Sequence, residues 1–193
     1  YGPFKEAFNN RMVFVYGTAG NPTENDWSLA KARFDAERFW YQGNGSIEIV
    51  SDASLQEMMS AEADQHRDRN VILYGNADTN RAWAMLLSDS PVQVRRGAVR
   101  VDEQEMTGEN LAALFVRPRK DSERALVGVV SGSGPAGQRL LDRMSYFVSG
   151  AGFPDCLVVG EEMLQRGAEG LRAVGFFGLD WSVKSGEFRF RTP

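Results

Sequence analysis

Cysteine and histidine are almost absent from this sequence of 193 residues. The one cysteine, Cys156, cannot form an internal disulfide, and the apolar residues that follow it predict a buried thiol. His66 is the one histidine, and the charged residues around it indicate a surface position. No Cys/His cluster has zinc-ligand spacing, so we expect no metal site and no cofactor.

Long apolar runs and an excess of positive charge are also missing. No run approaches the roughly 20 residues that a membrane-spanning helix needs, so we expect no membrane insertion. Lys and Arg number 22 against 26 Asp and Glu, which gives a net charge of −4. Domains that bind a phosphate backbone are usually basic on one face, so nucleic acid is not an expected partner.

What is present suits one packed α/β domain covering residues 1–193. The hydrophobic fraction is 42% and the charged fraction 25%, values typical of a folded domain. The first half reads as alternating buried strands and helices: strand 12–16, helix 27–41, strand 46–50, helix 54–64, strand 70–74 and helix 80–87. Such alternation predicts parallel strands joined by crossover helices. Because the chain begins at Tyr1 and not at Met, we expect it to be a processed or excised piece of a longer protein.

The second half changes character. Residues 91–101 hold Gly97 at their centre and predict a hairpin, and 114–117 reads as a short strand. The remaining elements are a strand at 125–130, a helix at 137–147, and strand candidates at 156–159, 173–177 and 187–191. We therefore predict a three-layer, mainly parallel Rossmann-like sheet with an antiparallel extension.

Three of the expected strands end in glycine-containing loops. The carboxyl ends of parallel strands meet at one edge of a sheet, and ligands of open α/β sheets bind there. This edge is the predicted place for a small ligand. The candidate binding residues are Gly17, Thr18, Gly75, Asn76, Asp78, Asn80, Ser131, Gly132, Ser133 and Gly134.

Residues 132–137 fit the Gly-x-Gly-x-x-Gly spacing between an expected strand and an expected helix. Glycines at such a turn let the backbone approach a phosphate, so a dinucleotide site, another small-anion site and a merely tight turn are all open. The acidic residue of a dinucleotide site should end the next strand, but Asp155 precedes that strand. This departure from the dinucleotide-site pattern favours the interpretation as a tight turn.

Catalytic constellations are incomplete. A Ser-His-Asp triad would need His66, which lies just before the strand at 70–74 and so belongs at the opposite edge from the loops. No Gly-x-Ser-x-Gly elbow occurs. A hydrolase built on Asp26 or Asp78 ranks last. Residues 39–41 (FWY) could form a recognition patch, although packing of an amphipathic helix on the core is the favoured interpretation.

Several short segments resemble, in order, the C-terminal region of bacterial prolyl oligopeptidase-like α/β-hydrolase family proteins. The matching segments are GPFKEAF at 2–8 leading into Gly17-Thr18, the strand and Asn-rich loop at 70–80, the Ser-Gly turn ending 127–134, Pro154-Asp155 and GFF at 175–177. In that family the nucleophile lies upstream of this region. The resemblance therefore implies an upstream catalytic domain as partner and export to the periplasm or the outside.

Two functions follow as hypotheses. The first is a non-catalytic accessory domain of an esterase- or peptidase-like serine hydrolase, because the resemblance is ordered and the nucleophile is missing. The second is a small-ligand module, binding an anion or a nucleotide through the glycine-containing loops. No residue of this chain takes over a catalytic role from the family, because the serine elbow and a late histidine are both absent.

Overall fold

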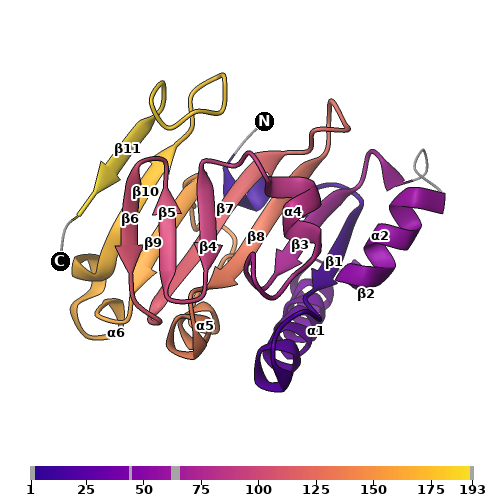
Figure 1. The fold of residues 1–193 in the computed structure, drawn as a ribbon, viewed down its shortest axis with the longest axis horizontal. Coiled ribbons are helices and arrows are strands. Elements are labelled where there is room, and N and C mark those ends of the chain that lie inside the picture. Colours follow the sequence, from indigo (N-terminus) through magenta and orange to yellow (C-terminus); the bar gives the residue numbers. More distant parts are fainter. Residues whose placement is uncertain (1–2, 44, 62–65, 192–193) are drawn as a thin grey trace.

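The computed structural model describes residues 3–43, 45–61 and 66–191 (Figure 1). Its strands are β1 (Met12–Tyr16), β2 (Glu48–Ser51), β3 (Asn70–Tyr74), β4 (Val92–Arg95), β5 (Ala98–Val101), β6 (Gln104–Thr107), β7 (Leu111–Pro118), β8 (Leu126–Gly132), β9 (Cys156–Gly160), β10 (Leu171–Phe176) and β11 (Glu187–Phe190). Its helices are the 3-10 turns η1 (Phe4–Phe8) and η2 (Gly167–Gly170) and the α-helices α1 (Pro22–Gly43), α2 (Asp52–Ala61), α4 (Ala82–Leu87), α5 (Pro135–Leu141) and α6 (Met163–Arg166).

The strands form two sheets. The larger sheet has eight strands in the order β11-β10-β9-β7-β8-β3-β1-β2, and the smaller has three in the order β4-β5-β6. Strands β2, β1, β3 and β8 pair in parallel, whereas β7 pairs antiparallel with both β8 and β9, and β10 with both β9 and β11. The larger sheet is therefore mixed, and the smaller one is antiparallel.

The predicted three-layer, mainly parallel Rossmann-like sheet is wrong. Strand β7 spans eight residues and lies inside the sheet between β8 and β9, where the sequence predicted a short strand in an antiparallel extension. The connection from β7 to β8 is too short for a crossover helix, so the two strands must be antiparallel. On one face, part of the expected helical layer is replaced by the β4-β5-β6 sheet (Figure 1).

Each face of the larger sheet has its own core. On one face the sheet packs against α2, α4 and the smaller sheet, with Leu55, Trp83 and Val94 among the buried side chains. On the other face it packs against η1, α1 and α5, with Phe4 and Leu140 among them. Alternating side chains of the central strands point to opposite faces and both faces are covered, which is why Val71, Ile72 and Leu73 of β3 are all apolar.

Helix α1 begins five residues before its predicted start. The Asn21 Oδ1 atom accepts from the Glu24 N–H at 3.0 Å, and Glu24 Oε2 accepts from the Asn21 N–H at 2.8 Å. This reciprocal capping box, with Pro22 at the first helical position, makes residues 22–26 helical where the sequence predicted a loop. The helix ends at Gly43, two residues after its predicted end.

The aromatic residues at the end of α1 divide between core and surface. Phe39 is half-buried and packs on Phe147, with 5.9 Å between ring centroids. Trp40 is 56% exposed and Tyr41 is 73% exposed. The favoured interpretation of core packing is therefore wrong for these two residues.

Candidate functional site

The three glycine-containing loops lie together at one edge of the larger sheet. The strands before them, β8, β3 and β1, are adjacent and parallel, so the loops leave from the same end. The predicted gathering of these loops is confirmed. Their role in ligand binding stays a prediction, and the hydrogen bonds of each loop show what is available for it.

The loop after β1 uses its own backbone donors. Every N–H from residue 17 to residue 21 has an acceptor inside the chain. In order, these acceptors are Ser28 Oγ, Asp52 Oδ2, Thr79 O, Asn25 Oδ1 and Glu24 Oε2. A phosphate cradle requires free N–H groups, and this stretch offers none.

Gly17 is needed for packing between loops. A Cβ atom at this position would lie 2.3 Å from the Thr79 carbonyl oxygen. The loop after β1 therefore rests directly on the loop after β3. Close approach of two backbones explains this glycine without a ligand.

Asn80 joins the ends of β1 and β3. Its side chain is buried, and Nδ2 donates to the carbonyl oxygens of Tyr74 at 2.9 Å and Val15 at 3.2 Å. Its Oδ1 accepts from the Ala82 N–H at 3.0 Å and so caps the first turn of α4. All the polar atoms of this amide bind the protein itself.

Asn76 joins β3 to β8 in the same way. Its Nδ2 donates to the Gly132 carbonyl oxygen at 3.0 Å, and its Oδ1 accepts from the Asp78 N–H at 3.0 Å. The preceding Gly75 has φ of +106°, a conformation that other residues rarely adopt. The second loop is thus a tight turn fixed by its own side chains.

The third loop contains two buried serines. Ser133 Oγ donates to the Gly108 carbonyl oxygen at 2.6 Å and accepts from the Leu111 N–H at 3.2 Å. Ser131 Oγ is buried and has no hydrogen-bond partner among the described residues. Gly134 is extended and directly precedes α5. Within the part of the chain that the structure describes, neither serine has a base at hydrogen-bond distance, which a nucleophile requires.

The turn between β4 and β5 covers part of this edge. The Gly97 N–H donates to the Ser133 carbonyl oxygen at 2.8 Å. Asp78 accepts from Arg95 Nη1 and from the Arg96 N–H, both at 2.9 Å. These contacts occupy the carboxylate of Asp78, which weakens the hypothesis of a hydrolase built on it.

Arg96 fastens the same turn to α1. Its Nε lies 2.7 Å from Glu24 Oε1, and its Nη2 lies 2.8 Å from Oε2. Hydrogen bonding to this guanidinium lowers the pKa of Glu24, against the opposing effect of burial. The carboxylate that caps α1 is therefore also the anchor of the β4–β5 turn.

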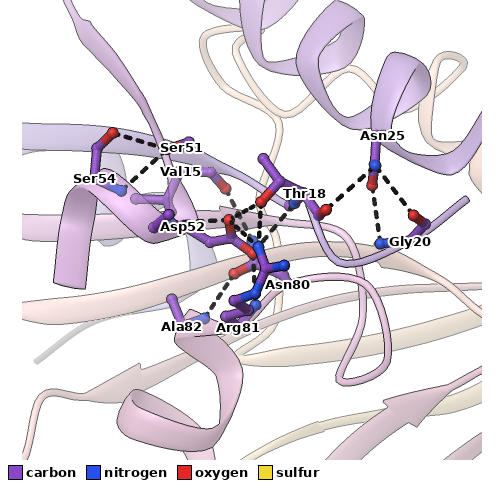
Figure 2. A network of polar contacts seen from close by, with 12 residues as sticks. Val15, Thr18, Gly20, Asn25, Ser51, Asp52, Ser54, Asn80, Arg81 and Ala82 are labelled. Atoms are coloured by element: carbon purple, nitrogen blue, oxygen red, sulfur yellow. Dashed lines mark hydrogen bonds and ion pairs between the residues drawn. The ribbon is translucent and has the colours of Figure 1, made fainter. Parts of the chain in front are cut away.

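The buried carboxylate of Asp52 links the end of β2 to this edge of the sheet (Figure 2). It follows β2 and accepts from Thr18 Oγ1 at 2.5 Å and from the Thr18 N–H at 3.2 Å. It also accepts from the N–H groups of Arg81 at 2.7 Å and Ala53 at 2.9 Å. The half-exposed Arg81 guanidinium lies 3.5 Å from Asp52 Oδ1 and donates to Thr18 Oγ1. A carboxylate engaged by so many donors holds loops in place and is poorly suited to proton transfer.

Sequence reasoning missed Asp52 and Arg81. The signal for Asp52 was available, because it directly follows an expected strand parallel to β1 and should reach the same edge. Arg81 carried no comparable signal, since its backbone N–H, at 2.7 Å, lies closer to the Asp52 carboxylate than its guanidinium does, at 3.5 Å. Backbone contacts of this kind do not depend on residue type.

The reactive side chains noted in the sequence lie elsewhere. His66 precedes β3 and is at the opposite edge from the loops, as predicted; its carbonyl oxygen accepts from Arg119 Nη1 at 2.9 Å. Cys156 is fully buried, as predicted, and burial raises the pKa of its thiol. Asp26 is exposed on α1. Among the described residues, no group of three His, Cys, Asp or Glu could hold a metal ion.

Comparison with known proteins gives one distant similarity to report. No protein-family profile matches the chain. A protein of Arthroderma benhamiae described as an uncharacterized secreted protein is 27% identical over 148 residues. The match covers 74% of this chain but only 15% of that relative. No helix in the described part of the chain has the length and apolar character to cross a membrane.

Proposed function

We propose that this chain is a non-catalytic accessory α/β domain of a longer, exported esterase- or peptidase-like serine hydrolase. In this function it packs beside the catalytic domain and helps to shape access to the substrate. The observation that carries the proposal is the state of the strand-end loops. Their backbone donors, amides and carboxylates bind one another, which is expected of a scaffold and not of a reaction centre.

Two further observations support the proposal. The ordered segments that resemble the C-terminal region of prolyl oligopeptidase-like proteins imply a nucleophile upstream of this chain. The fungal relative is several times longer than the matched region and is described as secreted, which favours a periplasmic or extracellular place for this chain as well. A domain of this kind contributes surface and rigidity to a larger protein, and it needs no catalytic group of its own.

The loops give little support to the second hypothesis, a module for small anions or nucleotides. Such a module would need unpaired N–H groups at the strand ends. Calorimetric titration of the chain with phosphate and with ATP tests it. We expect no heat of binding, and a saturable signal that is lost in Gly132→Ala would favour the module over the scaffold.

The decisive experiment is an assay of the chain by itself against p-nitrophenyl esters and chromogenic peptides. We expect no turnover above the buffer rate. Ser131→Ala, Ser133→Ala and His66→Ala should behave like the parent chain. Turnover that any of these variants abolishes would contradict a non-catalytic function. Turnover that survives all three would demand a different catalytic site.

Packing beside a larger neighbour can be tested in the fungal relative. Removal of the matched region, which is 15% of that protein, should lower the Tm of the remainder. Supplying the removed region as a separate chain should restore part of that loss. An unchanged Tm of the remainder would count against packing between the two parts.

A further inference from the structure

A hollow lies between the two sheets. It has a volume of about 430 Å³ and is lined by β6 and by residues of β10 and β11. Pockets that hold small molecules commonly have volumes of this order. The whole of β6 lines it, so the outer edge of the smaller sheet is open at this point.

An ion pair between Arg172 and Glu162 lines part of the hollow. Arg172 Nη2 lies 2.7 Å from Glu162 Oε1, and the Arg172 side chain is only 11% exposed. Gly160, the last residue of β9, allows this arrangement, because a Cβ there would lie 2.4 Å from Glu162 Oε2. Glu162 Oε2 is buried and has no hydrogen-bond partner among the described residues. The pair therefore keeps little net charge, and Arg172 has N–H donors beyond the one that faces Glu162 Oε1.

The remaining lining balances polar and apolar groups. Glu105 and Glu162 are matched by Arg172 and Arg191, so these four side chains carry no net charge. Asn110 adds an amide, which offers both donors and acceptors. Met106, Leu111 and the 41%-exposed ring of Phe190 add apolar surface.

We propose that this hollow binds a neutral polyhydroxylated ligand, a short saccharide. A sugar hydroxyl both donates and accepts, so it can bind the amide of Asn110 and the remaining donors of Arg172, which both line the hollow. The C–H face of a sugar ring is apolar and packs on an aromatic ring such as Phe190. An inorganic anion or a cation fits less well, because the guanidinium and carboxylate groups already neutralise each other.

The test follows the backbone amide NMR signals of residues 104–107 during titration of the chain. The probes are glucose, N-acetylglucosamine, cellobiose and chitobiose, with phosphate, citrate and tri-alanine as competitors of other chemistry. We expect at least one neutral saccharide to shift these signals with a Kd on the order of 1 mM. Phosphate, citrate and the peptide should leave them in place.

Variants assign the binding to this hollow. Phe190→Ala should weaken binding of the saccharide by about tenfold. Glu162→Gln should weaken this binding measurably, and circular dichroism should show that its fold is intact. Lys184→Ala is the matched control, since Lys184 pairs with Glu103 on the exposed surface outside the lining. It should bind as the parent does.

Several results would overturn the inference. One is that none of the four saccharides shifts residues 104–107; another is that phosphate, citrate or the peptide shifts them more strongly. A third is equal weakening by Lys184→Ala and Phe190→Ala. The inference does not depend on the accessory role, because it concerns ligand binding by this chain without any catalytic neighbour.

Discussion

Lys31 Nζ lies 2.9 Å from Asp35 Oδ1, one turn apart on α1, and neither side chain is more than 2% exposed. Asp35 Oδ2 also accepts from the hydroxyls of Tyr74, at 3.1 Å, and Tyr146. This group joins α1 to β3 and to the segment after α5. Burial raises the pKa of Asp35, and the positive charge of Lys31 opposes the rise.

Replacing Lys31 by Met should destabilise the protein strongly at neutral pH. It leaves a buried carboxylate without its cation, which typically costs about 3 kcal/mol. Because the folded-state pKa of Asp35 is raised, protonation stabilises the folded form, and stability increases as the pH falls through that pKa. Without Lys31 the pKa rises further, so acidification should recover part of the loss. Urea unfolding of Lys31→Met and of the parent at a series of pH values measures this recovery of stability.

The double variant Lys31→Met with Asp35→Asn is the control for this pH effect. It has no carboxylate at position 35. Its stability deficit relative to the parent should therefore not shrink on acidification, as the deficit of the single variant does. A stability deficit of Lys31→Met that stays constant from neutral to acidic pH would show that Asp35 is not the group responsible.

Gly17→Ala should lower the free energy of unfolding by about 2 kcal/mol, a typical cost of overpacking. The added methyl group would collide with the Thr79 carbonyl oxygen, and both backbones would have to move. Gly152→Ala is the matched control, because a Cβ at that position meets no atom within 4 Å. Its stability should stay within about 0.5 kcal/mol of the parent. Equal stability of the two variants would contradict the packing explanation for Gly17.

Much of the fold was predictable from the sequence, and each wrong prediction has a specific physical cause. The buried strands at 12–16 and 70–74 and their glycine ends were readable, because apolar runs that stop at glycine leave few alternatives. The position of β7 inside the sheet was not, because strand order is set by pairing between segments remote in sequence, such as β7 with β9, and pairing partners carry no local signal.

In the candidate site, too, the sequence predicted the location of several residues but not the contacts that they make. Gly17, Asn76, Asn80 and Ser133 were correctly expected at one edge, because strand ends fix their location. Whether a polar side chain there faces a ligand or caps a neighbouring strand depends on distances of an ångström or two between loops remote in sequence. Spacing along the chain does not contain that information, so the contacts of Asp52 with Thr18 and Arg81 were not predictable, although its place at this edge was.

Asp52→Ala should be far more harmful than Arg81→Ala. The first change leaves the N–H groups of Thr18 and Arg81 without an acceptor in a buried place, which we expect to cost about 3 kcal/mol. The second removes a half-exposed guanidinium and keeps the backbone contact, so about 0.5 kcal/mol is expected. Thermal unfolding followed by circular dichroism measures both. Similar losses would mean that the exposed ion pair, and not the buried carboxylate, holds the strand ends.

Glu24 should give the protein a pH dependence of the opposite kind to that of Asp35. Its pKa is lowered, chiefly by the hydrogen bonds from Arg96, so its contribution to stability is complete above about pH 5 and disappears as the pH falls through the lowered pKa. Glu24→Gln should therefore be less stable than the parent at neutral pH, by about 1 kcal/mol. The two should converge in acid.

Glu37→Gln, on the exposed surface of the same helix, is the control for this change and should follow the parent at every pH. Arg96→Ala should reproduce the neutral-pH loss of Glu24→Gln, and combining the two should add little, because each breaks the same bidentate contact. Urea unfolding of the parent, the two single variants, their double variant and the Glu37→Gln control at neutral and acidic pH provides the comparison. Additive losses would mean that Glu24 stabilises α1 through its cap alone, and that the β4–β5 turn is held at the sheet edge by Asp78 and Ser133.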